Sequence, residues 1–118
     1  MSEIIHVLIT DNHAMVRNGL TMFLKSYPDI ELVGEASNGS EAITMCDTLH
    51  PNVVLMDLVM PKVDGITAVK QIKASFPEAK IIIVTSYESP VMRHEAELAG
   101  TFAYILKENL LDLRELLT

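Results

Sequence analysis

The chain has 118 residues, 49% of them apolar, and a formal net charge of -7 at pH 7. This length fits a single domain spanning residues 1–118, and the composition excludes a disordered chain. The apolar runs are too short to cross a bilayer, and an acidic surface without a Lys/Arg patch excludes direct binding of nucleic acid.

Short β-branched runs alternate along the chain with longer amphipathic stretches. In chain order they predict a strand at residues 7–10, a helix at 14–26, a strand at 31–34, a helix from Asn38 to about residue 49, a strand at 53–56, a helix at 65–76, a strand at 81–85, a helix at 90–99, a strand at 103–106 and a helix at 110–117.

Local signals mark several of these boundaries. Asn38 stands three residues before Glu41, which is the spacing of a helix-capping box. Gly100 suits the C-terminal cap of the helix before it. The runs at residues 53–56 and 81–85 show no alternation of apolar and polar residues, so both faces of these strands should be buried.

Five strand–helix repeats predict an α/β fold, a doubly wound five-stranded parallel sheet with helices on both faces. In such sheets ligands bind at the carboxyl ends of the strands, where the strand order reverses. The polar residues that follow the predicted strands are Asp11, Asn12, Asp57, Thr85, Ser86 and Lys107.

These residue types suit phosphoryl chemistry. Carboxylate and amide oxygens are hard ligands of the kind that Mg²⁺ takes, and a carboxylate can attack phosphorus to form an acyl phosphate. Lys107 and the Thr85 hydroxyl would hold the phosphoryl oxygens. Each residue also has an ordinary structural interpretation as a helix cap, a loop residue or a surface lysine. Their gathering at one edge of the sheet favours a functional site.

The motifs resemble those of the receiver domain of two-component response regulators, the CheY-like fold with strand order 2-1-3-4-5. The resemblance covers essentially the whole chain. In residues 53–65 an apolar strand precedes Asp57, and Met60-Pro61 and Asp64-Gly65 follow at fixed offsets. Residues 82–86 and 104–107 match two further motifs of the family.

This resemblance implies a phosphoacceptor and a metal site. Asp57 is expected to accept the phosphoryl group. Asp11, Asn12, Asp57 and the backbone carbonyl of Val59 are expected to bind Mg²⁺ or Mn²⁺. His13 is interpreted as a surface residue at the start of a helix.

The resemblance also implies a conformational switch. Thr85, Ser86 and Lys107 are expected to bind the phosphoryl group, and Tyr104 to change rotamer in response. The chain should not be an enzyme with a separate substrate, because it would catalyse only its own phosphorylation and dephosphorylation.

Two further positions bear on how long the phosphoryl group survives. Val59 lies two residues after Asp57, and Tyr87 lies two residues after Thr85. Both should flank the path of the attacking water. Neither is an acid or amide that would orient this water, so we expect Val59 and Tyr87 to gate dephosphorylation and to make the phosphorylated form long-lived.

Residues 7–17, 33–39 and 104–108 are similar to the NarL/FixJ subgroup. This similarity implies a sensor histidine kinase as phosphodonor, phosphorylation-promoted homodimerisation and control of transcription through a C-terminal helix-turn-helix domain beyond this chain. The single cysteine, Cys46, cannot form an internal disulfide, and the N-terminus lacks a secretion signal. We therefore expect a cytoplasmic protein without a membrane partner.

One departure from the family pattern leaves an alternative open. The acidic pair that precedes the first helix is Asp11-Asn12 rather than two acids. The loss of one negative charge suggests a phosphorylation-independent pseudo-receiver that serves as a protein-binding module. Intact Asp57, Thr85 and Lys107 favour the phosphorylated switch. An aspartyl phosphatase is disfavoured, since it would need a second acid where Val59 stands.

Overall fold

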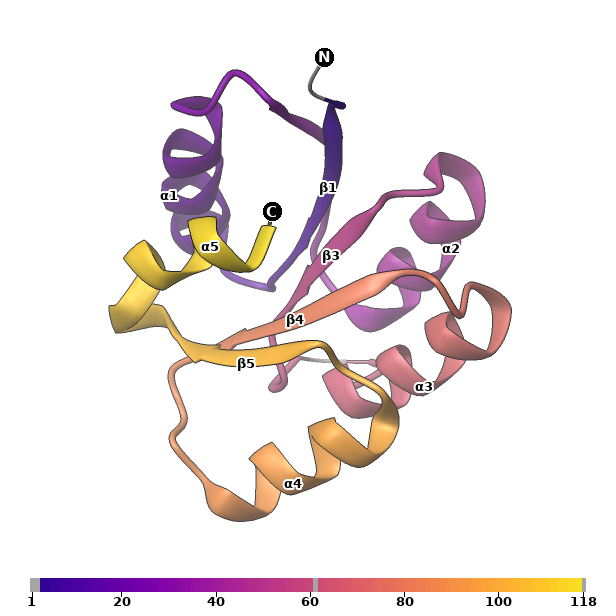
Figure 1. Ribbon diagram of the computed structural model, residues 1–118. Helices are drawn as coiled ribbons and strands as arrows, with labels where there is room; N and C mark the ends of the chain where they lie inside the picture. The colour runs from indigo at the N-terminus through magenta and orange to yellow at the C-terminus, as the bar shows by residue number, and fades with distance from the viewer. Residues whose placement is uncertain (1–2, 61, 118) are drawn as a thin grey trace.

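The computed structural model describes residues 3–60 and 62–117 as alternating strands and helices (Figure 1). The strands are β1 (Ile5–Thr10), β2 (Ile30–Ala36), β3 (Val53–Met56), β4 (Lys80–Thr85) and β5 (Ala103–Leu106). The helices are α1 (Ala14–Lys25), α2 (Gly39–Leu49), α3 (Gly65–Ser75), α4 (Pro90–Ala99), the 3₁₀ segment η1 (Lys107–Asp112) and α5 (Leu113–Leu117).

All five strands pair in parallel, in the order β2-β1-β3-β4-β5. The predicted α/β class, strand number and strand order are therefore confirmed. The order reverses direction between β1 and β3, so the two loops that follow these strands diverge there.

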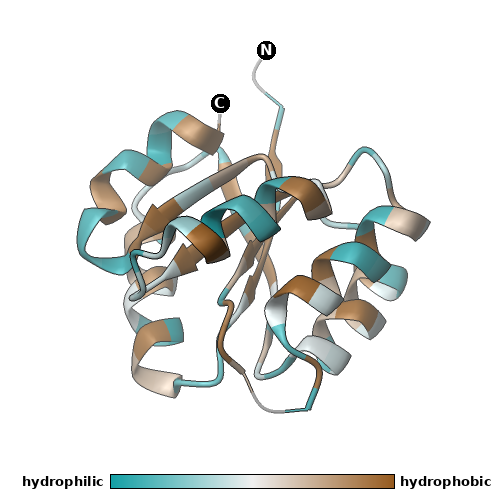
Figure 2. Ribbon diagram, turned by 90° about the horizontal axis from the view of Figure 1, so that it is seen from below, coloured by the Kyte–Doolittle hydropathy of each residue, from teal (hydrophilic) through white to brown (hydrophobic). Residues whose placement is uncertain are grey.

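The sheet separates two apolar clusters. Alternate residues of β1 point to opposite faces, so that Val7 and Ile9 pack with residues of α1 and α5, whereas Leu8 packs with residues of α2, α3 and α4. These two groups of helices lie on opposite faces of the sheet (Figure 1). The run Val53–Met56 is buried throughout, as its lack of alternation predicts. The helices carry hydrophobic residues on one side and hydrophilic residues on the other (Figure 2).

The predicted caps form, with one variation. The Asn38 side chain accepts a hydrogen bond from the Glu41 amide at 2.9 Å. The Glu41 carboxylate reaches back to Ser37, accepting from its amide at 2.7 Å and from its hydroxyl at 2.6 Å. This carboxylate therefore fixes the turn one residue before the helix-capping asparagine.

Three predicted elements differ from the structure by two residues or more. β1 begins at Ile5, two residues before the predicted strand at residues 7–10. β2 is longer than the predicted strand at residues 31–34, because its pairing with β1 continues past a register shift between Val7 and Leu8. The predicted helix at residues 110–117 is a 3₁₀ segment followed by a short α-helix, with a break at Asn109 (φ -113°, ψ 37°). Among the described residues, no helix is both long and apolar enough to span a membrane.

Candidate functional site

The carboxyl ends of β1, β3 and β5 bring together two acids and a lysine. Asp11 and Asp57 directly follow β1 and β3, and only 1% and 4% of their surfaces are exposed. Lys107 directly follows β5, and its Nζ atom lies 2.7 Å from Asp11 Oδ2 and 3.6 Å from Asp57 Oδ2. The positively charged ammonium group of Lys107 therefore lies between the two carboxylates.

Backbone hydrogen bonds fix where the two acids leave the sheet. The Asp11 amide donates to the Ala36 carbonyl at 3.0 Å, and the Asp57 amide donates to the Thr10 carbonyl at 3.0 Å. Each acid therefore occupies the next ladder position beyond the last residue of its strand. Their side chains are placed by the rigid sheet rather than by a free loop.

The start of α3 packs directly on the Asp57 loop. A Cβ atom at Gly65 would lie 2.4 Å from the Asp57 carbonyl oxygen and 2.7 Å from the Leu58 Cα. Glycine is therefore required by close backbone approach. Asp64 accepts a hydrogen bond from the Thr67 amide at 2.9 Å and caps the helix. Pro61, which the family motif places in this loop, lies outside the described residues.

The environment of Asp57 opposes its ionisation. Burial raises the pKa of this carboxyl above its ordinary value, and the negative charge of Asp11 raises the pKa further. Lys107 and the backbone N–H groups of Val59 and Leu58 act in the opposite direction. The site therefore holds more negative charge than its single lysine offsets, and an added cation would stabilise it.

This pKa shift predicts how stability depends on pH in the metal-free chain. Between the ordinary carboxyl pKa and the raised folded value, the folded state binds more protons than the unfolded state, so stability falls as pH rises through that window. Asp57→Asn removes this cost. We expect the free energy of unfolding to be higher in the variant than in the native chain at pH 7.

Urea denaturation with a metal chelator, at pH 7 and again near pH 4, measures the effect. The difference between the variant and the native chain should shrink at the lower pH. A variant that is less stable at pH 7 would show that Lys107 compensates the Asp57 charge in full.

Two residues near the acids were not predicted as members of the site. His13 donates its amide to Asp11 Oδ1 at 2.8 Å, and its Nδ1 lies 3.1 Å from the same oxygen. Arg17 Nη1 donates to the Asp11 carbonyl at 2.7 Å, and Arg17 Nε pairs with Glu35 at 3.3 Å. The sequence holds no direct signal for this pair, because His13 is the extended residue before α1 and the loop that follows β1 sets the position of its ring.

The donor chemistry of the cluster fits a divalent cation. Asp11, His13 and Asp57 each offer one ligand atom, and these atoms all lie within 4.8 Å of one another. Two carboxylates are a usual protein contribution to a magnesium site, in which water and phosphate oxygens complete the shell. Asn12 and Val59 are exposed beside this cluster.

The expected switch residues form a connected chain near β4 and β5. Thr85 is fully buried, and its Oγ1 accepts a hydrogen bond from the Tyr87 amide at 3.3 Å. The Tyr104 hydroxyl donates to the Tyr87 carbonyl at 2.5 Å. The backbone of Tyr87 therefore connects Thr85 to Tyr104. Ser86 lies between Thr85 and Tyr87 in the sequence and is exposed.

An arginine holds Tyr104 in its present position. The Arg93 guanidinium lies 4.3 Å from the centre of the Tyr104 ring and donates to the Tyr104 carbonyl at 3.3 Å. Glu88 accepts from Arg93 Nη2 through both carboxylate oxygens, at 3.0 and 2.9 Å. Movement of the Tyr104 ring would have to disturb its contact with the Arg93 guanidinium.

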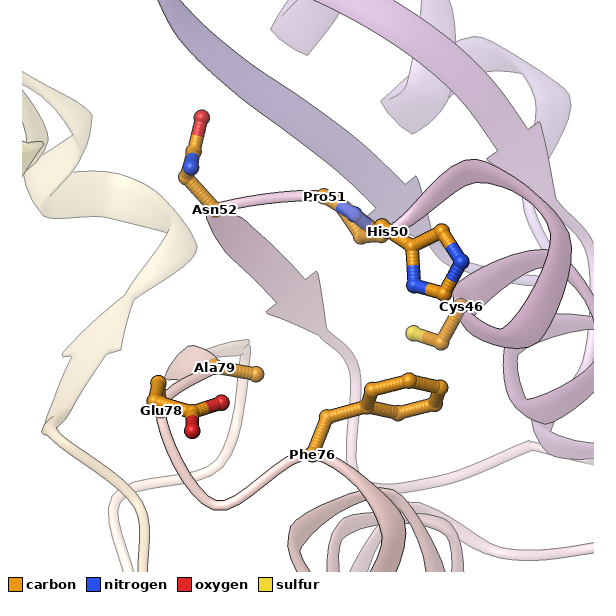
Figure 3. A pocket seen from close by; sticks show the side chains of 7 residues that line it. All are labelled: Cys46, His50, Pro51, Asn52, Phe76, Glu78 and Ala79. Carbon is orange, nitrogen blue, oxygen red and sulfur yellow. The ribbon is translucent and has the colours of Figure 1, made fainter.

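Two hollows lie at opposite ends of the sheet. One of about 260 Å³ is lined by Ser86, Leu106, Lys107 and Glu108, beside the acidic cluster. The other, of about 330 Å³, lies where β3 and β4 begin, and Figure 3 shows the side chains of His50, Phe76 and Glu78 around it. Burial raises the pKa of the Cys46 thiol in this second hollow to about 11, so the thiol stays protonated.

Comparison with known proteins agrees with this arrangement. The family model described as "response regulator receiver domain" matches residues 7–118. The transcriptional regulatory protein LiaR of Bacillus subtilis is 48% identical over 103 residues, which cover 87% of this chain and 49% of LiaR. The chain thus spans about half the length of the curated relatives it matches.

Two solved structures are similar in fold and sequence. A LuxR-family DNA-binding response regulator from Staphylococcus aureus gives a TM-score of 0.88 at 28% identity, covering 95% of this chain and 94% of that one. The receiver domain of RcsB from Salmonella enterica, solved with the phosphomimetic BeF₃⁻, gives 0.84 at 29% identity, covering 91% and 80%. With its CheY-like sheet and the acidic pair Asp11 and Asp57 at the strand ends, the chain belongs to the response regulator receiver domain family.

Proposed function

We propose that the chain accepts a phosphoryl group on Asp57 in a Mg²⁺-dependent reaction, and that phosphorylation changes the conformation of Tyr104. The observation that carries this proposal is the buried carboxylate of Asp57 at the end of β3, facing both Asp11 and Lys107. The likeness to a receiver domain solved with a phosphomimetic supports it.

The chemistry assigns a step to each residue. An Asp57 carboxylate oxygen attacks the phosphorus of the donor, a phosphorus–oxygen bond forms, and the bond to the departing group breaks with its electron pair. Mg²⁺, when bound by Asp11, Asp57, Asn12 and the Val59 carbonyl, would neutralise the phosphoryl oxygens.

Two further side chains complete the binding of the phosphoryl group. Lys107 needs to move only from Asp11 toward Asp57 to meet it, since its Nζ already lies 3.6 Å from Asp57 Oδ2. The hydroxyls of Thr85 and Ser86 would bind another phosphoryl oxygen.

The output follows from the hydrogen-bonded chain beyond Thr85. If the Thr85 hydroxyl turns to the phosphoryl group, it gives up the Tyr87 amide, and the Tyr87 carbonyl that holds Tyr104 is free to shift. Two arrangements of the same residues then change in population. The proposed phosphodonor is a sensor histidine kinase. The proposed output is transcription through a DNA-binding domain, since the similar LiaR is a transcriptional regulatory protein and the similar protein from Staphylococcus aureus is a DNA-binding response regulator.

Phosphoryl uptake from a small donor tests this proposal. The chain is incubated with Mg²⁺ and acetyl phosphate, and the intact mass is measured. A gain of one phosphoryl group that a chelator prevents is the expected result. Without any gain, the chain would be a pseudo-receiver that binds partners independently of phosphorylation.

Asn12 predicts weaker magnesium binding than an acid would give at this position. Asn12→Asp adds a negative charge beside Asp11 on the exposed rim of the cluster, where a charge pair contributes roughly 1 kcal/mol, or about fivefold in affinity. Titration with Mg²⁺ should show this tightening. Asn12→Ala is the control and should not tighten binding. Equal or weaker affinity in Asn12→Asp would contradict the assignment of residue 12 to the metal site.

Phosphorylation is expected to promote homodimerisation through one of two exposed apolar surfaces. On the α4–β5 side, Val91, Leu98 and Phe102 are exposed by 67%, 74% and 56%. On the α1 side, Met15 and Met22 are exposed by 87% and 76%. Association would remove either set from water.

Light scattering of the chain with and without beryllium fluoride measures this association. The pair Val91→Ser with Leu98→Ser and the pair Met15→Ser with Met22→Ser identify the surface, since only one pair should prevent the dimer. A monomer in both states at high concentration would remove the dimer from the proposal and leave the switch intact.

A further inference from the structure

The imidazole of His13 lies at the mouth of the acidic cluster. One of its ring nitrogens, one Asp11 oxygen and one Asp57 oxygen all lie within 4.8 Å of one another. Ligand atoms that share a metal at about 2.1 Å stand roughly 3–4 Å apart. The three groups therefore need only a small closing movement to meet one cation.

The backbone holds His13 in this place from both sides. Its amide donates to Asp11 Oδ1 at 2.8 Å, and its carbonyl accepts the Arg17 amide at 3.1 Å. The Arg17 side chain, in turn, donates a hydrogen bond to the Asp11 carbonyl at 2.7 Å. Although His13 occupies the capping position of α1, its side chain makes no capping hydrogen bond within the described part of the chain.

The position of Lys107 shows independently that this space favours positive charge. Burial and mutual repulsion disfavour two ionised carboxylates side by side. The Lys107 ammonium offsets this negative charge, since it lies 2.7 Å from Asp11 and 3.6 Å from Asp57. A divalent cation that displaced Lys107 would find two oxygen donors and, at the rim, one imidazole.

This donor set differs in kind from an all-oxygen site. Mg²⁺ prefers oxygen ligands and water, whereas imidazole suits Ni²⁺, Zn²⁺ and the neighbouring first-row metals. Residue 12, where a second acid could bind the metal, is an asparagine in this chain. After the Asp11 and Asp57 carboxylates, the His13 imidazole nitrogen would therefore be the third strong metal ligand from the protein.

We propose that His13 is a metal ligand of this site and makes it selective for nitrogen-accepting first-row transition metals, so that Ni²⁺ or Zn²⁺ competes with Mg²⁺ for Asp11 and Asp57. The inference rests on the proposed metal site, and it adds a ligand and a selectivity to that site.

Paired titrations of tag-free protein with Ni²⁺ and with Mg²⁺ test the proposal. Because losing even an outer partner of a metal site weakens binding by about 10–100-fold, His13→Ala should weaken Ni²⁺ binding by at least about tenfold. Its Mg²⁺ affinity should change far less. His94→Ala, an exposed histidine on α4, is the matched control and should leave both affinities unchanged.

A spectroscopic measurement separates ligation from mere positioning of Asp11. Electron spin-echo modulation of bound Cu²⁺, a paramagnetic first-row metal that also takes imidazole, should contain a histidine nitrogen coupling that changes on ¹⁵N-histidine labelling and disappears in His13→Ala. If His13→Ala weakens Ni²⁺ and Mg²⁺ equally and no nitrogen coupling is seen, His13 only orients Asp11 and the proposal is wrong.

The same proteins distinguish failure of this inference from failure of the proposed function. Phosphoryl uptake by His13→Ala with Mg²⁺ would show that Asp57 functions whatever the outcome for the imidazole. Unchanged Ni²⁺ affinity in Asp57→Asn would place the metal elsewhere and overturn the inference, even if Asp57 is phosphorylated in the native chain.

Discussion

Replacing Asp57 with asparagine is expected to abolish phosphoryl uptake completely. The amide that replaces the carboxylate has no oxygen basic enough to attack phosphorus. Asp11 cannot substitute for it, because its Oδ2 is paired with Lys107 at 2.7 Å and its Oδ1 accepts from the His13 amide at 2.8 Å. Asp64, another acid near the site, caps α3 through the Thr67 amide.

Intact mass after incubation with acetyl phosphate and Mg²⁺ measures the loss. Asp11→Asn is the matched control, since it removes an acid of the same cluster but keeps the nucleophile. It should still gain one phosphoryl group, more slowly because a metal ligand is lost. Full labelling of Asp57→Asn would exclude Asp57 as the sole acceptor.

The sequence predicts the fold and the edge on which the site lies because both depend on local signals. Continuous apolar runs such as Val53–Met56 identify strands buried on both faces. A polar residue directly after such a run must emerge at the carboxyl edge of a parallel sheet, whatever the loop does next. For this reason Asp11, Asp57 and Lys107 could be expected to meet.

The remaining features depend on contacts that the order of residues does not reveal. Lys107 lies closer to Asp11 than to Asp57, a choice set by the relative placement of three strand ends. The break in the helix at Asn109 could not be predicted, because no glycine or proline lies in the segment Lys107–Asp112. From the sequence His13 is interpreted as a surface residue at the start of a helix, and its side chain is 63% exposed in the structure, but the shape of the loop also brings its ring to the acids.

Two exposed residues beside the site are expected to set the lifetime of the phosphorylated form. Val59 and Tyr87 are 46% and 54% exposed and follow Asp57 and Thr85 by two positions each. The Tyr87 backbone is fixed at both its amide and its carbonyl, so its side chain starts from a defined place at the rim. We expect a water that attacks in line, opposite Asp57, to pass between these two side chains. Both are bulky enough to obstruct it, and neither is an acid or amide that would orient it.

The double variant Val59→Asn with Tyr87→Glu should therefore lose its phosphoryl group faster, by about a hundredfold, which is the size of effect that positioning of a reactant can have. Decay of the phosphorylated protein after donor removal and metal-buffered dilution measures the rate. Val59→Ala with Tyr87→Ala separates the two causes, because it opens the path without providing a group to orient the water. If the alanine pair accelerates decay as much as the polar pair, obstruction alone sets the lifetime. If neither pair changes the rate, the Tyr87 side chain points to solvent and the water approaches by another path.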